Sequence, residues 1–254
     1  AGQAMASGER MPLASLDAPA SGRMAVGEAL TNLLAAPVEL ERVKLSANWM
    51  AACGEDGEDA ALYDTVHAVA MELCPALGIS IPVGKDSLSM RTRWTDASGQ
   101  QRQVTSPVSL VVSAFASLES VADTWTPELR TGSALLLVDL GAGANRLAGS
   151  MLAQVSGQFG DVVPDLDDPA RLVRLASALA ELRAQGLVDA YHDRSDGGLW
   201  ATVCEMAFAG ATGVDIDVAD VPELFSEELG VVLGVAEADV DRALAVLSRH
   251  GLGE

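Results

Sequence analysis

Two apolar runs of strand length constrain the fold of this chain more than any other feature. "ALLLVDLG" (134–141) and "GVVLGVA" (230–236) are nearly continuous in Val, Leu, Ala and Gly, as expected of buried strands. Shorter strands are predicted at 188–191 and 213–218. Helical patterns lie around these strands, at 147–158, 169–185, 198–210, 222–228 and 238–250. Alternating strands and helices predict a compact α/β or α+β sandwich for this half of the chain.

The first half of the chain is predicted to be mixed α and β. Its opening (1–17) shows no clear first element. Helices are expected at 21–36, where Met24 and Leu30 begin an apolar stripe, and at 59–77, where Gly78 ends the helix. The stretch 79–94 predicts a strand, a turn at Gly84 and a second strand. A hairpin turn at 97–100 and a strand at 107–118 follow.

The composition excludes several classes of partner. The 254 residues hold 36 acidic and 16 basic side chains, a formal charge of −20, which repels nucleic acid and anionic membranes. A polyanion such as ATP would need a metal ion or well-placed donors. The three cysteines form no CxxC pair, and none of the three histidines has a nucleophile at a characteristic spacing. Without a membrane-length apolar run or a signal peptide, we expect a soluble cytoplasmic protein.

The segment "HDRSDGGL" (192–199) concentrates charge between a predicted strand and a predicted helix. The N-terminus of a helix presents unpaired N–H groups and partial positive charge, which suits phosphate. Asp196 or Ser195 could instead cap the helix, with the glycines allowing tight packing. Capping explains one polar side chain but not Asp193, Arg194 and Ser195 together, so both interpretations stay open.

Glu28 and Asn32 lie four positions apart on the first predicted helix, so they share one face about 6 Å apart along its axis. Two oxygen donors of this kind suit Mg²⁺, which uses few protein ligands and keeps waters or phosphate oxygens. A solvated helix face is the alternative. The next charged residue is Glu39, so the helix is otherwise apolar and its polar pair needs a partner.

The segment "PVGKDSLSM" (82–90) offers a second anion-binding candidate. Gly84, Lys85 and Ser87 follow a predicted strand in an order similar to loops in which backbone N–H groups and a lysine bind phosphate. It is not a P-loop, because the upstream glycine and the following helix are absent. A plain β-turn is the alternative. We assign Lys85 and Ser87 to a loop that faces an anion or a substrate.

Seven segments, in order, resemble the large single-chain phosphoribosylformylglycinamidine synthases of purine biosynthesis, the FGAR amidotransferases. They are "GERMPLASLDAPASGRMAVGEALTNL", "KLSANWMAACGEDGEDAALYDTV", "IPVGKDSLSMRTRW", "TSPVSLVVSAFA", "HDRSDGGL", "EMAFAG" and "FSEELG". The resemblance covers essentially the whole chain. That family has an N-terminal domain, a linker, two tandem halves similar to aminoimidazole ribonucleotide (AIR) synthetase, and a glutaminase domain.

The chain resembles most of the second synthetase-like half. The resemblance implies an α+β or α/β fold of two subdomains, each a mixed sheet with packed helices. We expect residues 1–120 to form the N-terminal subdomain without its first strands. We expect residues 131–254 to form the C-terminal subdomain, with the chain ending within it or at its edge.

The resemblance also implies an activity. Enzymes of this family convert formylglycinamide ribonucleotide (FGAR), glutamine and ATP into formylglycinamidine ribonucleotide. Their second half holds ADP and Mg²⁺ at a site regarded as structural. Matched motif by motif, Glu28, Asn32 and Asp193 correspond to the magnesium ligands and Ser195 to a nucleotide contact. A further family ligand, an Asp, lies upstream of this sequence, so Mg-ADP should bind weakly or not at all.

Two roles for the chain remain open at this stage. It contributes one wall of the amidation site of a ligase, or it is a noncatalytic nucleotide-binding scaffold. The implied partners are the first synthetase half, the glutaminase domain and a small-molecule substrate, with no nucleic acid and no membrane. Alone, the chain is expected to be inactive and to self-associate through the surface that its missing half would cover.

Overall fold

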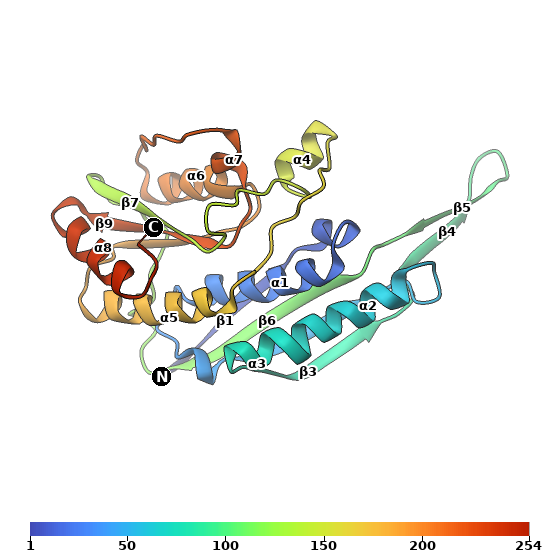
Figure 1. The fold of residues 1–254 in the computed structure, drawn as a ribbon, viewed down its shortest axis with the longest axis horizontal. Helices are drawn as coiled ribbons and strands as arrows, with labels where there is room; N and C mark the ends of the chain where they lie inside the picture. Colours follow the sequence, from blue (N-terminus) through green and yellow to red (C-terminus); the bar gives the residue numbers. More distant parts are fainter. Residues whose placement is uncertain (254) are drawn as a thin grey trace.

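The computed structural model describes residues 1–253 and builds them around two main sheets (Figure 1). The first has four strands in the order β1–β6–β2–β3. Their bounds are Gly2–Glu9 (β1), Lys44–Met50 (β2), Ser80–Ser87 (β3) and Ser109–Leu118 (β6). Strand β6 pairs antiparallel with β1 and β2, whereas β2 and β3 are parallel. This region is mixed α and β, as the sequence predicted.

Helices cover one face of the first sheet. Helix α1 (Ala18–Leu33) begins where the Asp17 carboxylate accepts the Ala20 N–H at 2.8 Å. Beside it runs a second helix made of three continuous pieces. They are α2 (Glu58–Val66), a π-helical segment (His67–Leu73) and α3 (Cys74–Leu77). The opposite face is open, and Met5 and Phe115, paired across β1 and β6, are both exposed there.

A hairpin projects from one end of this region, away from the body of the molecule (Figure 1). It consists of β4 (Arg91–Thr95) and β5 (Gln101–Thr105), which pair only with each other. The Asp96 side chain fixes its turn by accepting the N–H groups of Ser98 and Gln100. The predicted hairpin turn at 97–100 is therefore confirmed.

The second sheet has three antiparallel strands in the order β7–β9–β8. Their bounds are Ser133–Asp139 (β7), Ala190–Arg194 (β8) and Gly230–Ala236 (β9). In β9, Val231 and Leu233 belong to the main core, whereas Val232 packs in a second cluster with helix α6. Both faces of β9 are thus buried, which explains its continuous apolar run.

Helices flank both faces of this second sheet (Figure 1). They are α4 (Met151–Ser156), α5 (Pro169–Ala184), α6 (Gly198–Gly210), α7 (Val221–Phe225) and α8 (Val240–Arg249). Short 3₁₀ turns complete the described elements at Met11–Ser15, Leu40–Arg42 and Glu237–Asp239. Among residues 1–253, no helix combines the length and the apolar character needed to cross a bilayer.

One hydrophobic core joins the two regions. It runs without a break from Met24 and Leu30 on α1 to Leu179 on α5. The approach is close, because a Cβ added to Gly27 on α1 would lie 2.2 Å from Leu229 Cδ1. The shared core makes the two sheets parts of one packed unit.

The connection between the regions (119–132) is also held in place. The backbone N–H of Trp125 donates to the Ala35 carbonyl at 2.9 Å, and the Trp125 ring stacks on Tyr191 with centroids 5.8 Å apart. The Arg183 guanidinium carbon lies 3.4 Å from the centroid of the Trp125 ring, and this side chain also donates to the Leu34 carbonyl. The connection is therefore anchored to both halves.

Four expectations about elements were wrong. The opening of the chain, for which no element was predicted, forms β1. Gly84 lies inside β3 rather than in a turn, and its missing Cβ leaves room for the Ala47 carbonyl of β2. Residues 213–218 are extended but belong to no strand. The helix expected at 147–158 is reduced to Met151–Ser156.

Candidate functional site

Glu28 lies where the two regions meet, beside the end of β1. Its carboxylate accepts the backbone N–H of Glu9 at 2.9 Å and lies 3.5 Å from Arg10 Nε. Burial raises the pKa of Glu28 to about 7, although Arg10 and the Glu9 N–H both lower it. Asp196 and Asp193 raise this pKa further, so carboxylates of the second region are close to Glu28.

Asp193 faces this junction from β8 and is 9% exposed. Burial raises its pKa, and the neighbouring His192 opposes that effect. The His192 ring is held at both nitrogens: Nδ1 donates to the Asp193 carbonyl at 2.7 Å, and Nε2 lies 2.8 Å from a Glu205 carboxylate oxygen. Glu28 and Asp193 are thus carboxylates of opposite regions that interact electrostatically, and their role as magnesium ligands stays a prediction.

Ser195 follows Asp193 in the turn between β8 and α6 and is half-buried. Its carbonyl accepts the Gly198 N–H at 3.0 Å. Neither Ser195 nor Asp196 caps the helix, because the capping position is Gly197 in a left-handed conformation (φ 81°). The capping interpretation of this segment is therefore wrong for both side chains.

Arg194, the basic residue of the same segment, is a structural anchor. It is 1% exposed and donates to the Glu228 carbonyl at 2.7 Å and to the Leu229 carbonyl at 3.1 Å. It also forms an ion pair with Asp139 at the end of β7. Internal ion pairing and hydrogen bonding of Arg194 therefore explain part of the charge in this segment, whereas Asp193 interacts with Glu28 across the junction.

The other predicted site residues lie on two different elements of the first region. Asn32 is exposed, one turn beyond Glu28 on the same helix. Lys85 and Ser87 lie on β3, at the opposite edge of the sheet from β1. Lys85 is exposed and pairs with Asn48, whose Oδ1 atom is buried without a hydrogen-bond partner. The structure does not bring Lys85 and Ser87 to the junction.

Two charged residues of the junction were missed at the sequence level. Arg10 is 2% exposed, and its guanidinium lies 3.1 Å from Glu227 Oε2 and 3.4 Å from Asp196 Oδ1. Glu227 is also buried, and its Oε1 accepts the N–H groups of Met151 and Gly197 at 2.8 Å each. Both residues belong to segments, "GER" and "FSEE", that contain several charges, so the sequence alone did not single them out.

The junction suits a magnesium ion in donor chemistry. Glu28 and Asp193 are carboxylates and Asn32 offers an amide oxygen, which are the hard donors that Mg²⁺ prefers. Burial is the main cause of the raised pKa values of Glu28 and Asp193, so a cation bound between these carboxylates would favour their charged forms. Residues 1–253 contain no group of three or more His, Cys, Asp or Glu side chains placed to hold a metal. The donors therefore fit an ion that also uses phosphate oxygens, rather than a closed protein cage.

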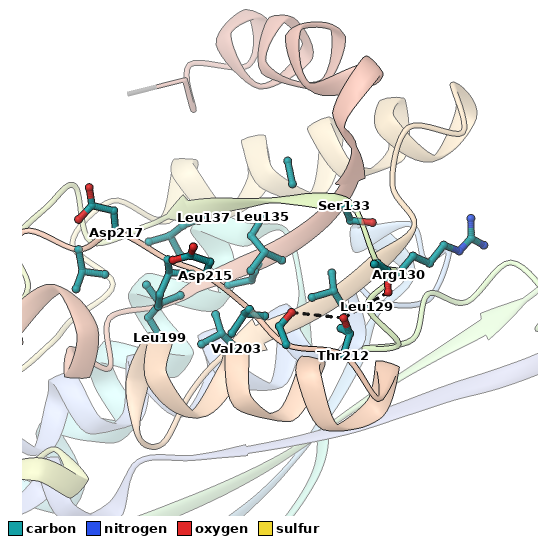
Figure 2. A pocket seen from close by; sticks show the side chains of 18 of the residues that line it. Leu129, Arg130, Ser133, Leu135, Leu137, Leu199, Val203, Thr212, Asp215 and Asp217 are labelled. Atoms are coloured by element: carbon teal, nitrogen blue, oxygen red, sulfur yellow. Dashed lines mark hydrogen bonds between the residues drawn. The ribbon is translucent and has the colours of Figure 1, made fainter.

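A separate cavity of about 510 Å³ lies in the second region (Figure 2). Leu135 and Leu137 of β7 and Leu199 and Val203 of α6 form its apolar lining. Asp215 and other residues of the extended segment 212–218 complete the wall. None of the predicted site residues lines this cavity, so it is distinct from the junction.

Two family models match consecutive parts of the chain. Residues 1–117 match the FGAR-AT PurM_N-like domain, and residues 130–254 match the C-terminal domain of AIR synthase related proteins. The two matches lie on either side of the connection between the sheets.

Solved structures show a similar fold. PurL of Thermotoga maritima in complex with ATP has a TM-score of 0.65 at 16% identity, over 98% of this chain and 38% of that one. The same protein in complex with FGAR has a TM-score of 0.68 at 16% identity, over 98% and 40%. Escherichia coli HypE has a TM-score of 0.63 at 19% identity, over 99% and 76%. The chain thus spans about two fifths of the PurL chains.

The fold, with two regions of mixed sheet and helix packed through one core, is that of an AIR synthetase-like protein. Within that class, its first region belongs to the FGAR-AT PurM_N-like domain family and its second to the C-terminal domain family of AIR synthase related proteins.

Proposed function

We propose that the chain is a synthetase-like half of an ATP-dependent ligase of purine biosynthesis, and that it holds a magnesium-bound nucleotide at the junction. The observation that carries the proposal is the convergence of Glu28 and Asp193 from two regions, both buried enough to raise their pKa values. The family match supports the pathway, and the PurL complexes with ATP and FGAR support the ligand classes.

In this proposal, the oxygens of Glu28, Asn32 and Asp193 hold Mg²⁺, and Ser195 contacts a phosphate. The metal would neutralise phosphate charge, which this acidic chain cannot do with its 16 basic residues. Helix α6 begins directly after the Ser195 turn, so the partial positive charge of its N-terminus also favours an anion there. The chain contributes binding and positioning at this site.

The whole ligase would perform an amidation. ATP phosphorylates the formamide oxygen of FGAR and leaves as ADP. Ammonia released from glutamine then attacks the carbon that bears this oxygen, and phosphate and a proton leave. We propose that the first synthetase half and a glutaminase domain, which other parts of the protein or partner chains would supply, complete this reaction. The chain alone should therefore not form the amidine.

Nucleotide binding tests the proposal directly. Isothermal titration of the chain with ADP, with and without MgCl₂, should show weak binding that requires the metal. Asp193→Asn should reduce the affinity at least about tenfold, since it removes one charged ligand. Asp215→Asn, on the rim of the separate cavity, is the matched control and should change nothing. Binding that is independent of magnesium, or of Asp193, would exclude the proposed site.

A second experiment separates a wall of the amidation site from a pure scaffold. Lys85 is exposed on the edge strand β3, far along the sheet from the junction. In the complete ligase, Lys85→Ala should reduce turnover without changing the bound nucleotide content if this half forms part of the substrate cleft. Unchanged turnover would favour the scaffold role.

A further inference from the structure

Arg10 is a buried cation at the boundary of the two regions. It follows β1 directly, and only 2% of it is exposed. Its Nη2 atom donates to the Glu227 carbonyl at 2.9 Å, and its Nη1 atom donates to the Glu227 carboxylate at 3.1 Å. A charge removed from water this completely is stable only where the surrounding groups compensate it.

The surroundings of Arg10 hold an excess of negative charge. Its guanidinium lies within 3.5 Å of the carboxylates of Glu28, Asp196 and Glu227. Asp193 adds a fourth negative charge close enough to raise the pKa of Glu28. One guanidinium therefore faces several carboxylates; on the Asp193 side, His192 Nδ1 lies 3.6 Å from Asp193 Oδ1, and the Arg194 guanidinium is paired with Asp139.

Arg10 also has an unused hydrogen-bond donor. The Nε atom is fully buried and has no hydrogen-bond partner; it lies 3.5 Å from Glu28 Oε2, beyond normal bonding distance. A buried N–H without a partner costs free energy, so the contact between Arg10 and Glu28 is electrostatic rather than a formed hydrogen bond. Arg10 is thus shared between Glu227, which it binds well, and Glu28, which it reaches incompletely.

Glu227 extends this arrangement to two helices. Its Oε1 accepts the N–H groups of Met151 and Gly197, which lie at the starts of α4 and α6. Its Oε2 accepts from Arg10. A change in the charge of Arg10 would therefore be felt both at the proposed magnesium ligand Glu28 and at the helix start that follows Ser195.

From these contacts we propose that Arg10 is the internal counter-cation of the junction, a positioning residue that holds the carboxylates of the two regions together and that a divalent cation can partly replace. The inference rests on the proposed function in one respect, that Glu28 is a magnesium ligand. The inference goes beyond the proposed function because it makes the metal requirement of the junction depend on Arg10, which is not one of the proposed metal or nucleotide ligands.

The test measures the effect of MgCl₂ alone on thermal unfolding of the chain, with NaCl at equal ionic strength as the salt reference. Arg10→Gln should lower Tm in EDTA, and MgCl₂ should restore at least half of that loss. The apparent Mg²⁺ affinity should rise about tenfold over the unsubstituted chain, because one repelling positive charge is gone. Arg10→Lys should behave nearly as the unsubstituted chain.

Arg23→Gln is the matched control. Arg23 lies on α1 and joins the two regions through a bidentate pair with Asp165, at 2.8 and 2.6 Å, away from the carboxylates of the junction. It should lower Tm without any gain from MgCl₂. Equal responses of the Arg10 and Arg23 variants to MgCl₂ would overturn the inference, as would no response in either.

A second variant covers the case in which Arg10→Gln fails to fold. Glu227→Gln keeps the oxygen that accepts the N–H groups of Met151 and Gly197 but removes one negative charge near Arg10. Arg10 is then free to compensate Glu28, so the stabilisation by MgCl₂ should fall. An unchanged or larger effect of MgCl₂ would contradict the inference. These readouts use no nucleotide, so failure of ADP binding and failure of this inference are seen separately.

Discussion

Replacing Gly8 by alanine should separate α1 from the first sheet. A Cβ on Gly8 would lie 2.2 Å from the Ala25 carbonyl oxygen and 2.4 Å from the Ala29 nitrogen. Carbon–oxygen contacts in proteins lie at about 3.3–3.6 Å, so α1 would have to retreat by about 1 Å. Both opposing atoms belong to the backbone of a helix, so no side-chain rotation can relieve the clash.

The magnitude follows from two opposing terms. Overpacking of a core typically costs about 1–3 kcal/mol, and the rigid backbone on both sides places Gly8→Ala at about 3 kcal/mol. Alanine restricts the unfolded chain more than glycine, which returns about 1 kcal/mol. The net loss of unfolding free energy should be about 2 kcal/mol, or a fall in Tm of about 4–8 °C for a chain of this length.

Urea unfolding followed by circular dichroism measures this loss, and Ser7→Ala provides the control on the exposed face of the same strand. The substitution should also weaken stabilisation by MgCl₂, because Glu28 on α1 is held by the N–H of Glu9, the residue after Gly8. A Gly8→Ala variant within 0.5 kcal/mol of the control, roughly the scatter of neutral surface changes, would refute the close packing of β1 on α1.

Three further outcomes are expected. Tyr191→Phe removes the hydrogen bond that the buried hydroxyl donates to the Thr31 carbonyl, and urea unfolding should show a loss of about 1–2 kcal/mol; no loss would mean that the bond contributes nothing. Burial raises the pKa of Asp139, but Arg194 and two backbone N–H groups lower it more, to below its ordinary value of 3.8. The stability that the Asp139 carboxylate contributes should be complete above pH 3.8 and should disappear as the pH falls through the folded pKa. Asp139→Asn should therefore flatten the acid side of the pH–stability profile. An unchanged profile would contradict this assignment. Burial raises the pKa of Cys74 to about 11, so mass spectrometry should find this thiol unalkylated by iodoacetamide at pH 8 until the chain is unfolded, and labelling of the native chain would show that it is accessible.

The fold was predictable wherever burial dictated the sequence. Strand β9 is buried on both faces, and its residues are therefore all apolar. Strand β1 is different, because Ala6 and Gly8 are its only fully buried residues and it owes its conformation to eight paired positions with β6. Residues 213–218 alternate apolar and acidic residues as a strand would, but among the described residues no neighbouring strand pairs with them. Whether β1 and residues 213–218 form strands therefore depends on pairing partners that are distant in the sequence.

The sequence singled out Glu28 and Asp193 of the candidate site but neither Arg10 nor Glu227. Glu28 and Asp193 stood out because each interrupts an otherwise apolar or regular pattern. Arg10 and Glu227 lie in short charged segments, and only the packing of the two regions turns them into buried partners. Lys85 was assigned to a loop from its order after Gly84, whereas that glycine allows close contact between two strands. Local sequence order does not distinguish a tight turn from a tight strand pair.

The shared core has a consequence for the kinetics of ligand exchange. Proteins that clamp a ligand between two lobes usually swing about a hinge, and the connecting segment is then free to bend. Here the connection is pinned by Trp125 and Arg183, and apolar side chains run unbroken across the boundary. The walls of the junction are therefore set before any ligand arrives, so binding demands little ordering of the chain. Exchange of the nucleotide proposed for this junction should therefore proceed without a swing of the two regions, so its rate should depend little on rearrangement of the chain.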